Sequence, residues 1–343
     1  MKPASLAALC LVLTACEEGP REWNDGVPQV AAAVETTPVA TLDDAADDPA
    51  IWVHPATPEK SLILGTDKDA GLYAYDLTGA VVQFLPLGEP NNVDLRQGVR
   101  IGKWAGDLAA ASNRSDDSIN LLSVTETGLQ TVGGFASAEV EPYGLCMGLI
   151  EGQVYIFVTH KSGMLRMYHV DAMETASEVA TLSFASQLEG CVHDDAMGML
   201  YIGEEDRGIW RSRSAGATLT AAEAVDQVGG DSGIADDVEG LAIYPTGAET
   251  GYLVASSQGN DSFAVYRREG GNAFIGRFRI GAGAVIDGAE ETDGIAVSAG
   301  FLGPDFPRGL LVAQDGFNAP EGSPQNFKYV DWREIEAVLG LAP

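Results

Sequence analysis

Acidic and polar residues open a recurring β-type segment along this chain, and together they could bind a divalent cation. The openers recur about every 50 residues, with differences of 46, 49, 46, 50 and 54: Asp48, Asp94, Tyr143, Glu189, Glu239 and Asp293. Carboxylates that converge on one surface repel each other, and they stay ionised when cations lie between them. Calcium suits such a set because it takes about six to eight oxygen ligands in flexible geometry. The sequence offers no comparable group of thiolate and imidazole ligands for zinc.

Basic residues occupy the turns that follow the second apolar segment in three consecutive repeats. These residues are Lys68, Arg114 and Lys161, in a chain with 20 Lys and Arg against 50 Asp and Glu. Bases beside a calcium cluster are repelled unless an anion lies between them, and arginine can grip an oxyanion through two hydrogen bonds. The arrangement favours a phosphate-bearing ligand. The alternative is that each base pairs with a neighbouring carboxylate on a solvated rim, which contributes little energy.

The repeat also predicts the architecture that positions these residues. Each unit contains several short strands, such as SLILGT, VYIFVT, MLYIGE and GYLVAS. Self-similarity at about 40–50 residues per unit is typical of β-propellers. We therefore expect an all-β fold, a six-bladed β-propeller with four-stranded antiparallel blades. Because strands alternate in direction, the start of each first strand and the turn between the second and third strands should lie on one face.

Composition limits the partners of the chain. Its 343 residues carry a formal net charge of −30, which argues against nucleic acid and anionic membrane surfaces as partners. No apolar stretch reaches the roughly 20 residues that span a bilayer, and the credible helix outside the N-terminal segment covers 332–340. We expect a monomer that binds a small polyanion through calcium.

The N-terminal segment has the features of an export signal. Lys2 precedes an apolar stretch from Leu6 to Leu13, and Leu13-Thr14-Ala15-Cys16 resembles a lipoprotein signal-peptidase site. We divide the chain into a signal peptide (1–15), the lipidated Cys16 with a polar tether (16–33) and the propeller (34–343). The protein would be exported and held in the cell envelope by its lipid, on the periplasmic side or at the outer membrane. The alternative is an ordinary secretory signal that contains a cysteine.

Two further cysteines, Cys146 and Cys191, lie at similar positions in neighbouring first strands. Each follows its opener by three residues or fewer, and an exported protein meets an oxidising compartment. A disulfide between them is one interpretation, and two buried thiols are the other.

Motifs spread over residues 35–335 together resemble those of the β-propeller phytases. In chain order they are DDPAIWVHP, NNVDLR, AAASNRS, EPYG, LEG, EEDRGIW, DVEGL, ASSQGN, ETDGI, VAQDG and QNFK. The resemblance covers essentially the whole propeller. It implies a calcium-dependent phosphomonoesterase, a phytase of the 3-phytase type. Such an enzyme hydrolyses calcium phytate (inositol hexakisphosphate) to lower inositol phosphates and inorganic phosphate with a metal-activated water.

The resemblance also implies roles for individual residues. The implied metal ligands are Glu35, Asp47, Asp48, Glu189, Glu205, Asp237, Glu239, Asp287, Asp293 and Asp315, of which Glu35, Asp287 and Asp315 match structural calcium positions. The implied catalytic residues are Glu189, Glu205, Asp237, Glu239 and Tyr143. The implied substrate-binding residues are Lys68, Arg114, Lys161, Tyr143 and Gln258. Two positions depart from the family pattern, because Ser162 and Phe317 stand where acidic residues are expected, and each departure weakens one calcium site.

Two other functions stay open at this point. A calcium-dependent lactonase or esterase propeller would share the acidic channel, but it would not need three phosphate-binding bases. A non-catalytic binding propeller of the cell envelope would use calcium only to stabilise its fold.

Closure of the ring requires one more strand than the last repeat provides. Three strands are recognisable after Asp293, so we expect the segment 36–42 to supply the missing edge strand. Such closure would join the two ends of the propeller and remove exposed sheet edges.

Overall fold

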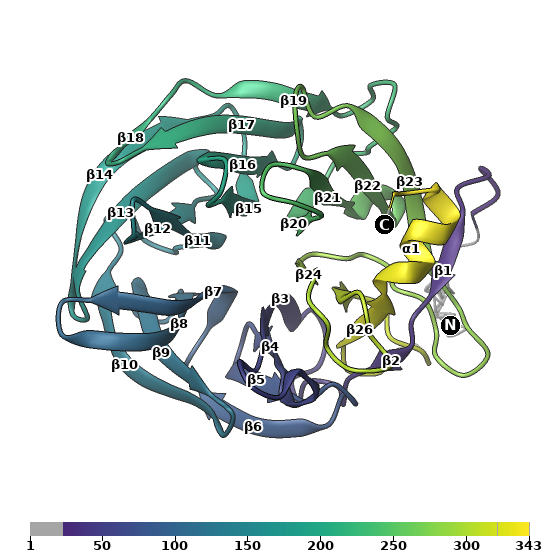
Figure 1. Ribbon diagram of the computed structural model, residues 1–343, viewed down its shortest axis with the longest axis horizontal. Coiled ribbons are helices and arrows are strands. Elements are labelled where there is room, and N and C mark those ends of the chain that lie inside the picture. The colour runs from purple at the N-terminus through teal and green to yellow at the C-terminus, as the bar shows by residue number, and fades with distance from the viewer. Residues whose placement is uncertain (1–22, 321, 343) are drawn as a thin grey trace, which may run out of the picture.

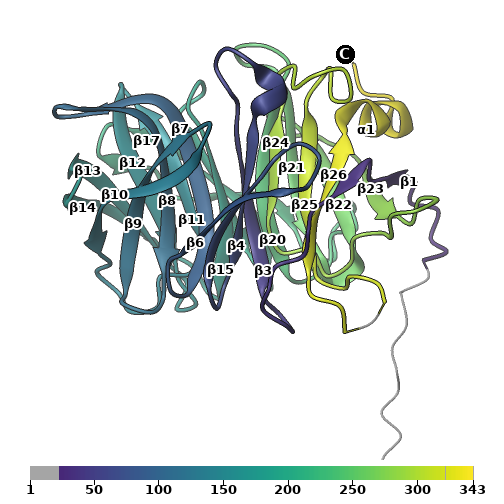
Figure 2. The same ribbon diagram turned by 90° about the horizontal axis from the view of Figure 1, so that it is seen from below.

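The computed structural model describes residues 23–320 and 322–342, which form six β-sheets around a central axis. The sheets follow one another around the ring like blades (Figure 1), and their strands run roughly along the propeller axis (Figure 2). The first strand of each blade lies innermost, and the next strands pair with it in order toward the outside. The prediction of an all-β, six-bladed propeller is therefore confirmed.

Blades 1 to 3 each take four consecutive antiparallel strands from the chain. Blade 1 contains β3 (Ala46–Trp52), β4 (Leu62–Asp67), β5 (Gly71–Tyr75) and β6 (Val81–Pro86). Blade 2 contains β7 (Pro90–Ile101), β8 (Trp104–Asn113), β9 (Ser118–Thr125) and β10 (Gly128–Ala136). Blade 3 contains β11 (Leu145–Ile150), β12 (Gln153–Thr159), β13 (Met164–Ala172) and β14 (Thr175–Ser183).

Blades 4 to 6 differ from this pattern at their outer edges. Blade 4 contains β15 (Leu188–Asp194), β16 (Met199–Glu204) and β17 (Gly208–Ala215), and β17 pairs outward with β18 (Thr218–Leu219) and β19 (Glu223–Gln227). Blade 5 contains β20 (Val238–Pro245), β21 (Gly251–Ser257), β22 (Ser262–Arg267), β23 (Phe274–Gly281) and β1 (Gln29–Ala31). Blade 6 contains β24 (Ile295–Ser298), β25 (Leu310–Asp315), β26 (Asn326–Asp331) and β2 (Val34–Glu35). Two short 3-10 helices, η1 (Pro58–Lys60) and η2 (Gln258–Asn260), lie in connections between strands.

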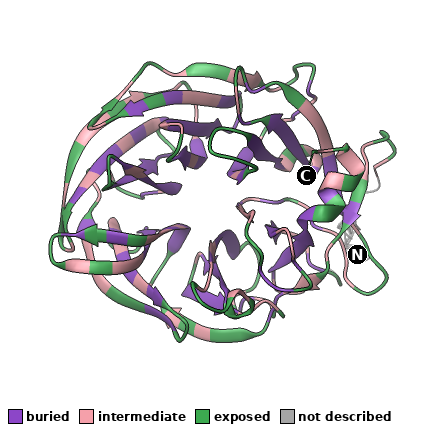
Figure 3. Ribbon diagram, in the orientation of Figure 1, coloured by how far each residue is buried: buried purple, intermediate pink, exposed green. Residues whose placement is uncertain are grey.

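Burial falls from the inner to the outer strands of the blades (Figure 3). Every residue of β4 and of β25 is buried, whereas no residue of β6 is buried. The inner strands are short continuous apolar runs because neighbouring blades cover both of their faces. Between blades 2 and 3, for example, Leu108 and Ile119 share one buried cluster with Ile156 and Tyr168. The core therefore lies between the blades, and it holds the inner strands in place around the channel.

The N-terminal segment closes the ring. β2 pairs antiparallel with β26 as the outer strand of blade 6, so the two ends of the propeller belong to one sheet. The strand covers Val34–Glu35, and the prediction that placed it at 36–42 is wrong in position. The N–H groups of Thr36 and Val39 still donate to β26 and to Gln325. Pro38 between them has no N–H to donate, which explains why regular pairing stops.

The folded part of the chain begins earlier than the predicted boundary at residue 34. β1 pairs in parallel with β23 and adds a fifth strand to blade 5. Asp25 forms a bidentate ion pair with Arg279, at 2.7 and 2.9 Å, and the Arg279 guanidinium lies 4.3 Å from the ring centroid of Trp23. These contacts dock residues 23–33 on the propeller, so the tether predicted over 16–33 is too long. The predicted signal peptide (1–15) and Cys16 lie outside the described residues.

The C-terminal helix α1 (Trp332–Leu339) matches the helix expected over 332–340. Its N-cap is Asp331, whose carboxylate accepts a hydrogen bond from the backbone N–H of Arg333. Trp332 is buried and stacks on Tyr244, with ring centroids 3.8 Å apart, so the helix packs against blade 5. No helix in the described part of the chain has the length and apolar character needed to cross a membrane.

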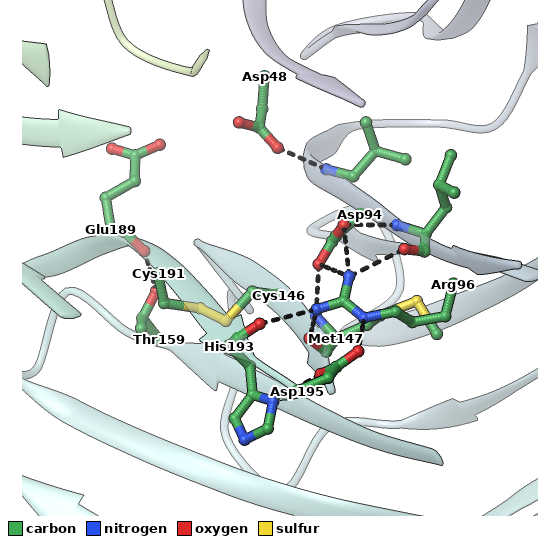
Figure 4. Close-up of a disulfide and its surroundings, with 12 residues drawn as sticks. Asp48, Asp94, Arg96, Cys146, Met147, Thr159, Glu189, Cys191, His193 and Asp195 are labelled. Carbon is green, nitrogen blue, oxygen red and sulfur yellow. Dashed lines mark hydrogen bonds and ion pairs between the residues drawn. A yellow bond between two sulfur atoms is a disulfide. The ribbon is translucent and has the colours of Figure 1, made fainter. Parts of the chain in front are cut away.

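Cys146 and Cys191 form a disulfide between the inner strands of blades 3 and 4 (Figure 4). Of the two interpretations of these cysteines, the structure has the cross-link, with the Cα atoms 5.6 Å apart. Close to it, the Arg96 guanidinium donates to the Met147 carbonyl oxygen and to the Asp195 carboxylate. Arg96 comes from blade 2, so covalent and polar contacts join three successive blades at this level of the channel.

Candidate functional site

A cavity of about 660 Å³ opens where the starts of inner strands meet the turns between second and third strands. Its lining is dominated by acidic and amide side chains from blades 1, 3, 4, 5 and 6: Asp43, Asp44, Lys68, Tyr143, Glu189, Glu205, Asp237, Glu239, Gln258, Glu291, Asp293, Asn318 and Gln325. The alternation of strand direction therefore collects these two sets of residues on one face of the propeller, as the repeat predicted.

The same local irregularity occurs at the start of four inner strands. The pairing register shifts between Ala46 and Pro49 in β3, and the same shift recurs in β7, β15 and β20. In each case two residues face one residue of the neighbouring strand, which is a β-bulge. The bulged pairs are Asp47–Asp48, Asn91–Asn92, Glu189–Gly190 and Glu239–Gly240. A bulge redirects side chains and ends regular pairing, and here it presents them at the mouth of the channel.

Glycine follows the glutamate in two of these bulges because the next blade comes close. A Cβ on Gly190 would lie 2.0 Å from the Glu239 carbonyl oxygen. A Cβ on Gly240 would lie 2.6 Å from the Ile295 nitrogen. Either side chain would push the neighbouring blade outward. Gly190 therefore sets the spacing between Glu189 and Glu239, and Gly240 sets the spacing between Glu239 and Asp293.

Polar side chains near the ends of second strands tie each bulge region to the next blade. Three hydroxyl groups donate to backbone carbonyl oxygens at 2.6–2.7 Å: Ser112 to Tyr143, Thr159 to Glu189 (Figure 4) and Ser256 to Thr292. In blade 6 the amide of Gln314 donates to the carbonyl oxygen of Ala46 at 3.0 Å. These bonds run from blade to blade around the ring and hold the backbone of the site rigid.

Glu189, Glu205 and Glu239 form the glutamate cluster, in which one carboxylate oxygen of each residue lies within 4.8 Å of the other two. Glu189 and Glu239 are buried, and the Glu239 Oε2 has no hydrogen-bond partner in the described part of the chain. Burial, with a contribution from Asp47, raises the pKa of Glu189 to about 8. Burial and Glu189 together raise the pKa of Glu239 as well. Carboxylates held this close resist ionisation unless a cation binds among them.

Asp47, Lys68 and Asp293 form the neighbouring part of the site. The Lys68 Nζ lies 3.3 Å from Asp47, 3.5 Å from Asp293 and 2.9 Å from Asp44. Burial opposes the charge of Lys68, but these carboxylates together raise its pKa. The Gln258 amide donates a short hydrogen bond to the other oxygen of Asp293. Lys68 is therefore already paired and neutralises part of the acidic rim.

Arg114 and Lys161 differ from Lys68, because neither forms an ion pair with a carboxylate among the residues that the structure describes. The Arg114 Nη2 donates to the Lys68 carbonyl oxygen at 3.2 Å. The Arg114 Nε is buried and has no hydrogen-bond partner among the described residues. The Lys161 side chain is exposed, and its Nζ lies 4.3 Å from the ring centroid of Tyr143. Pairing with rim carboxylates, the alternative explanation for the three bases, thus holds for Lys68 and not for the other two.

Tyr143 and Asp237 line the cavity beside the glutamate cluster, whereas Asp48 lines the channel. Burial and the Glu189 carboxylate raise the pKa of Tyr143, so its hydroxyl stays protonated and can donate a hydrogen bond. Asp237 has a left-handed backbone conformation, with a φ of 56°, and burial raises its pKa. Asp48 accepts a hydrogen bond from the Val93 N–H at 3.0 Å and lines a separate cavity of about 240 Å³ in the channel.

The predicted peripheral ligands Glu35, Asp287 and Asp315 converge on a lysine that the sequence analysis did not single out. The Lys328 Nζ lies 2.7 Å from Glu35 and 3.2 Å from Asp315, and it also contacts Asp287. Its side chain is fully buried. Burial raises the pKa of Asp315 to about 7, and the carboxylates raise the pKa of Lys328 although burial opposes them. An ammonium group lies among these carboxylates, so calcium fits here less well than at the glutamate cluster, and the predicted ligand role stays a prediction.

Asp94, Ser162 and Glu204, the last of which directly precedes Glu205, have other partners. The Asp94 carboxylate accepts hydrogen bonds from Arg96 and lines the channel cavity. The Glu204 carboxylate accepts two backbone N–H groups and one hydroxyl from residues 185–186, so it is used within the fold. Ser162, which stands where an acid was expected, donates to Glu139 at 2.6 Å. A carboxylate from the preceding connection therefore reaches that turn.

Sequence reasoning missed Asp44 and Glu291 on the cavity wall and Asn91 beside Glu189. Asn91 could have been found, because the NN of NNVDLR corresponds to the DD of DDPAIW when the repeats are aligned at the bulge. Asp44 and Glu291 lie in connections before the inner strands and carry no such signal. Phe317 lies on the cavity wall, where a carboxylate had been expected.

Comparisons with known proteins agree with this geometry. The family model described as Phytase matches residues 4–343. The 3-phytase of Bacillus subtilis (strain 168) is 40% identical over 359 residues, which cover 99% of this chain and 93% of that protein. Among solved structures, the crystal structure of BBS1N in complex with ARL6DN, soaked with lead, is similar with a TM-score of 0.51 and 12% identity, over 82% of this chain and 78% of that chain, a likeness of fold alone. From the family model and the Bacillus relative, the chain belongs to the phytase family.

Proposed function

We propose that this protein hydrolyses phytate to lower inositol phosphates and inorganic phosphate, and that it does so with bound calcium. The observation that carries the proposal is one juxtaposition. The glutamate cluster shares its cavity with Lys68 and Tyr143, and each of these two residues contacts one further base. Arg114 donates to the Lys68 carbonyl oxygen and Lys161 lies over the Tyr143 ring, and neither base makes a carboxylate ion pair in the described part of the chain. An acidic centre requires cations, whereas free bases on its rim favour an anion, and a phosphate ester bound with calcium satisfies both. Membership of the phytase family and the activity in the name of the Bacillus relative support the same substrate.

The donor set of the cavity fits calcium. Among the described residues, the group of His, Cys, Asp and Glu side chains close enough to hold a metal consists of the three glutamates. The buried Oε2 of Glu239 has no hydrogen-bond partner among the described residues, and hard oxygen donors of this kind suit calcium. When bound, calcium would neutralise phosphate charge and lower the pKa of a coordinated water.

The residues around this centre would then have separate tasks. Glu189, Glu205 and Glu239 would hold the cation in a rigid frame that the bulges and inter-blade hydrogen bonds provide. Arg114 and Lys161 would bind phosphate oxygens and stabilise the charge that moves onto them in the transition state. The protonated hydroxyl of Tyr143 would donate to the same substrate.

A lactonase or esterase propeller remains the alternative enzyme. It would share the acidic centre, but a carboxylic ester carries no charge for Arg114 and Lys161 to bind. A non-catalytic binding propeller would use the same bases and would release no phosphate.

The deciding experiment measures phosphate release from phytate by the purified protein after chelation and after calcium is added back. We expect turnover with calcium and a fall of at least about 100-fold with chelator, since metal and charge stabilisation carry the reaction. An aryl lactone is assayed in parallel. Turnover that chelation leaves unchanged would contradict the role of calcium, and hydrolysis of the lactone without phosphate release would establish the alternative.

We also propose that the protein is exported and anchored in the cell envelope by a lipid on Cys16. The Leu13-Thr14-Ala15-Cys16 sequence supports this, as does the disulfide, which suits an oxidising compartment. Because Trp23 is docked on blade 5, six residues separate it from Cys16. A Cys16→Ser variant should move from the membrane fraction to the soluble fraction of cells, and continued membrane association would contradict the proposal.

A further inference from the structure

Asn91 is a buried residue beside the glutamate cluster to which the proposed function assigns no task. It lies in the bulge of β7, at the position that Asp47 occupies in blade 1, Glu189 in blade 4 and Glu239 in blade 5. The exposed fraction of the residue is 0%. Asn91 is therefore the neutral member of a set whose other members carry carboxylates.

The amide of Asn91 is held against Glu189. Its Nδ2 donates to the Glu189 Oε1 at 2.8 Å and to the Asn92 Oδ1, also at 2.8 Å. Both amide protons are thus used, and one of them is used on a predicted metal ligand. An amide N–H can donate but not accept, so this bond favours an unprotonated Oε1 and fixes the rotation of the Glu189 carboxylate. Burial of both side chains shields the bond from water.

The other end of the same amide makes no comparable contact. The Asn91 Oδ1 is buried and accepts no hydrogen bond in the described part of the chain. A buried acceptor without a partner lowers stability, and an apolar residue at this position would avoid that loss. A buried acceptor without a partner is rare in native structures and calls for an explanation. Here the explanation is the Asn91 Nδ2, which the fold retains as a donor to Glu189.

We propose that Asn91 is a positioning residue whose amide orients Glu189 as a cation ligand and thereby sets the calcium affinity of the glutamate cluster. The inference rests on the calcium dependence in the proposed function. Hydrogen bonds that orient metal ligands change metal affinity or activity by about 10- to 100-fold when they are removed. Asn91→Ala removes this donor and leaves all three glutamates in place.

The test is calorimetric titration of calcium into metal-stripped protein without substrate. Glu189→Ala identifies the calcium sites that depend on Glu189. For those sites we expect Asn91→Ala to raise the Kd by about tenfold or more. In the Glu189→Ala background, Asn91→Ala should have no further effect on the remaining sites, because Asn91 acts through Glu189.

A matched control separates orientation from loss of stability. Asn272 is also buried, in the connection between β22 and β23. Its Nδ2 donates to the Tyr201 hydroxyl of blade 4 and to the carbonyl oxygens of Arg267 and Arg268. Asn272→Ala should lower the Tm and leave calcium affinity unchanged. Should Asn91→Ala fail to fold, Asn91→Ser, with a smaller loss of volume, takes its place.

Two results would overturn the inference. One is a calcium Kd within twofold of wild type in a folded Asn91 variant, and the other is an equal weakening with and without Glu189. The phytate assay stays separate from this titration. If wild type binds calcium through Glu189 and releases no phosphate, the proposed function fails while the role of Asn91 is still decided by the Kd values.

Discussion

Two groups of three carboxylates in this propeller differ in what neutralises them. In the lysine-centred cluster, the ammonium group of Lys328 contacts Glu35, Asp287 and Asp315. In the glutamate cluster, three carboxylates face one another beside a large cavity, and the nearby Lys68 is paired with other acids. Both clusters draw their members from distant parts of the chain. The lysine-centred cluster has an ammonium group at its centre, and the glutamate cluster has none among the described residues.

This difference affects how well each cluster could bind a cation from solution. Lys328, whose pKa is raised, supplies one positive charge to three carboxylates, and the pKa of Asp315, about 7, indicates that this cluster also takes up a proton near neutral pH. The pKa of Glu189, about 8, shows that the glutamate cluster takes up protons when no other cation is present. The glutamate cluster has no ammonium group at its centre and is therefore the better site for calcium, whereas calcium at Glu35, Asp287 and Asp315 stays a prediction.

The largest effect is expected from Glu239→Gln, which removes one charge from the glutamate cluster. The amide is a poorer ligand for a hard cation, so phytate turnover should fall by about 1,000-fold or more while the fold remains. Steady-state phosphate release and circular dichroism measure the two quantities. Glu204→Gln is the matched control, because this buried glutamate is bonded to residues 185–186 and not to the cavity. Near-normal turnover in the Glu239 variant would show that the glutamate cluster is not needed for the reaction.

The next effect concerns stability and the lysine-centred cluster. Lys328→Met leaves three buried or half-buried carboxylates without their cation, which should lower the free energy of unfolding by about 3–5 kcal/mol. Denaturant unfolding in the presence of chelator measures it. Lys60→Met, which removes an exposed partner of Glu126, should leave the free energy of unfolding close to that of wild type. If added calcium restored the lost stability of the Lys328 variant, the distinction between the two clusters would weaken.

A third effect should appear as a dependence of stability on pH in metal-stripped protein. The folded pKa of Glu189 is about 8, and its ordinary value is 4.5. Between these values the folded state holds a proton that the unfolded state has released, so stability is lost as pH rises through this range. Asp315, with a pKa of about 7, contributes in the same direction at lower pH. Burial also raises the pKa values of Glu239 and Asp293, so the interval from pH 7 to 9 reports on Glu189 together with the other carboxylates of its cavity. The Tm should fall by several degrees over that interval without calcium. A fall of the same size with saturating calcium would contradict the assignment of the cation to this cluster.

The repeat made the ring and most of the site predictable from the sequence, because each blade carries its site residues at the same local position. The alignment of repeats failed in blade 2. Asp94 was taken as the opener, whereas the residue in the bulge at the position of Glu189 and Glu239 is Asn91, three positions earlier. Asp94 instead pairs with Arg96 in the channel. The strand register, which the bulge sets, identifies Asn91 as the residue equivalent to Glu189 and Glu239, whereas residue type does not.

The lysine-centred cluster could not be predicted for a different reason. Glu35 and Lys328 are 293 residues apart, and no local pattern shows that this lysine is buried. The same holds for β1, whose parallel pairing with β23 depends on the docking of residues 23–33 rather than on their own strand propensity. Contacts between the two ends of the chain can therefore be identified from the folded structure but not from local sequence patterns.

The smallest expected effect tests whether this docking supports the lysine-centred cluster. Asp25→Asn removes the ion pair with Arg279, and because the Asp25 side chain is 41% exposed, the loss at pH 7 should stay below about 1 kcal/mol. The hydrogen bonds from Arg279 lower the pKa of Asp25, so its contribution is present above the ordinary value of 3.8 and is lost as pH falls further. Denaturant unfolding at pH 7 and pH 3 should therefore show a smaller difference from wild type at pH 3. A loss of about 3 kcal/mol or more, similar to that of Lys328→Met, would mean that the segment carrying Glu35 and the lysine-centred cluster unfold as one unit.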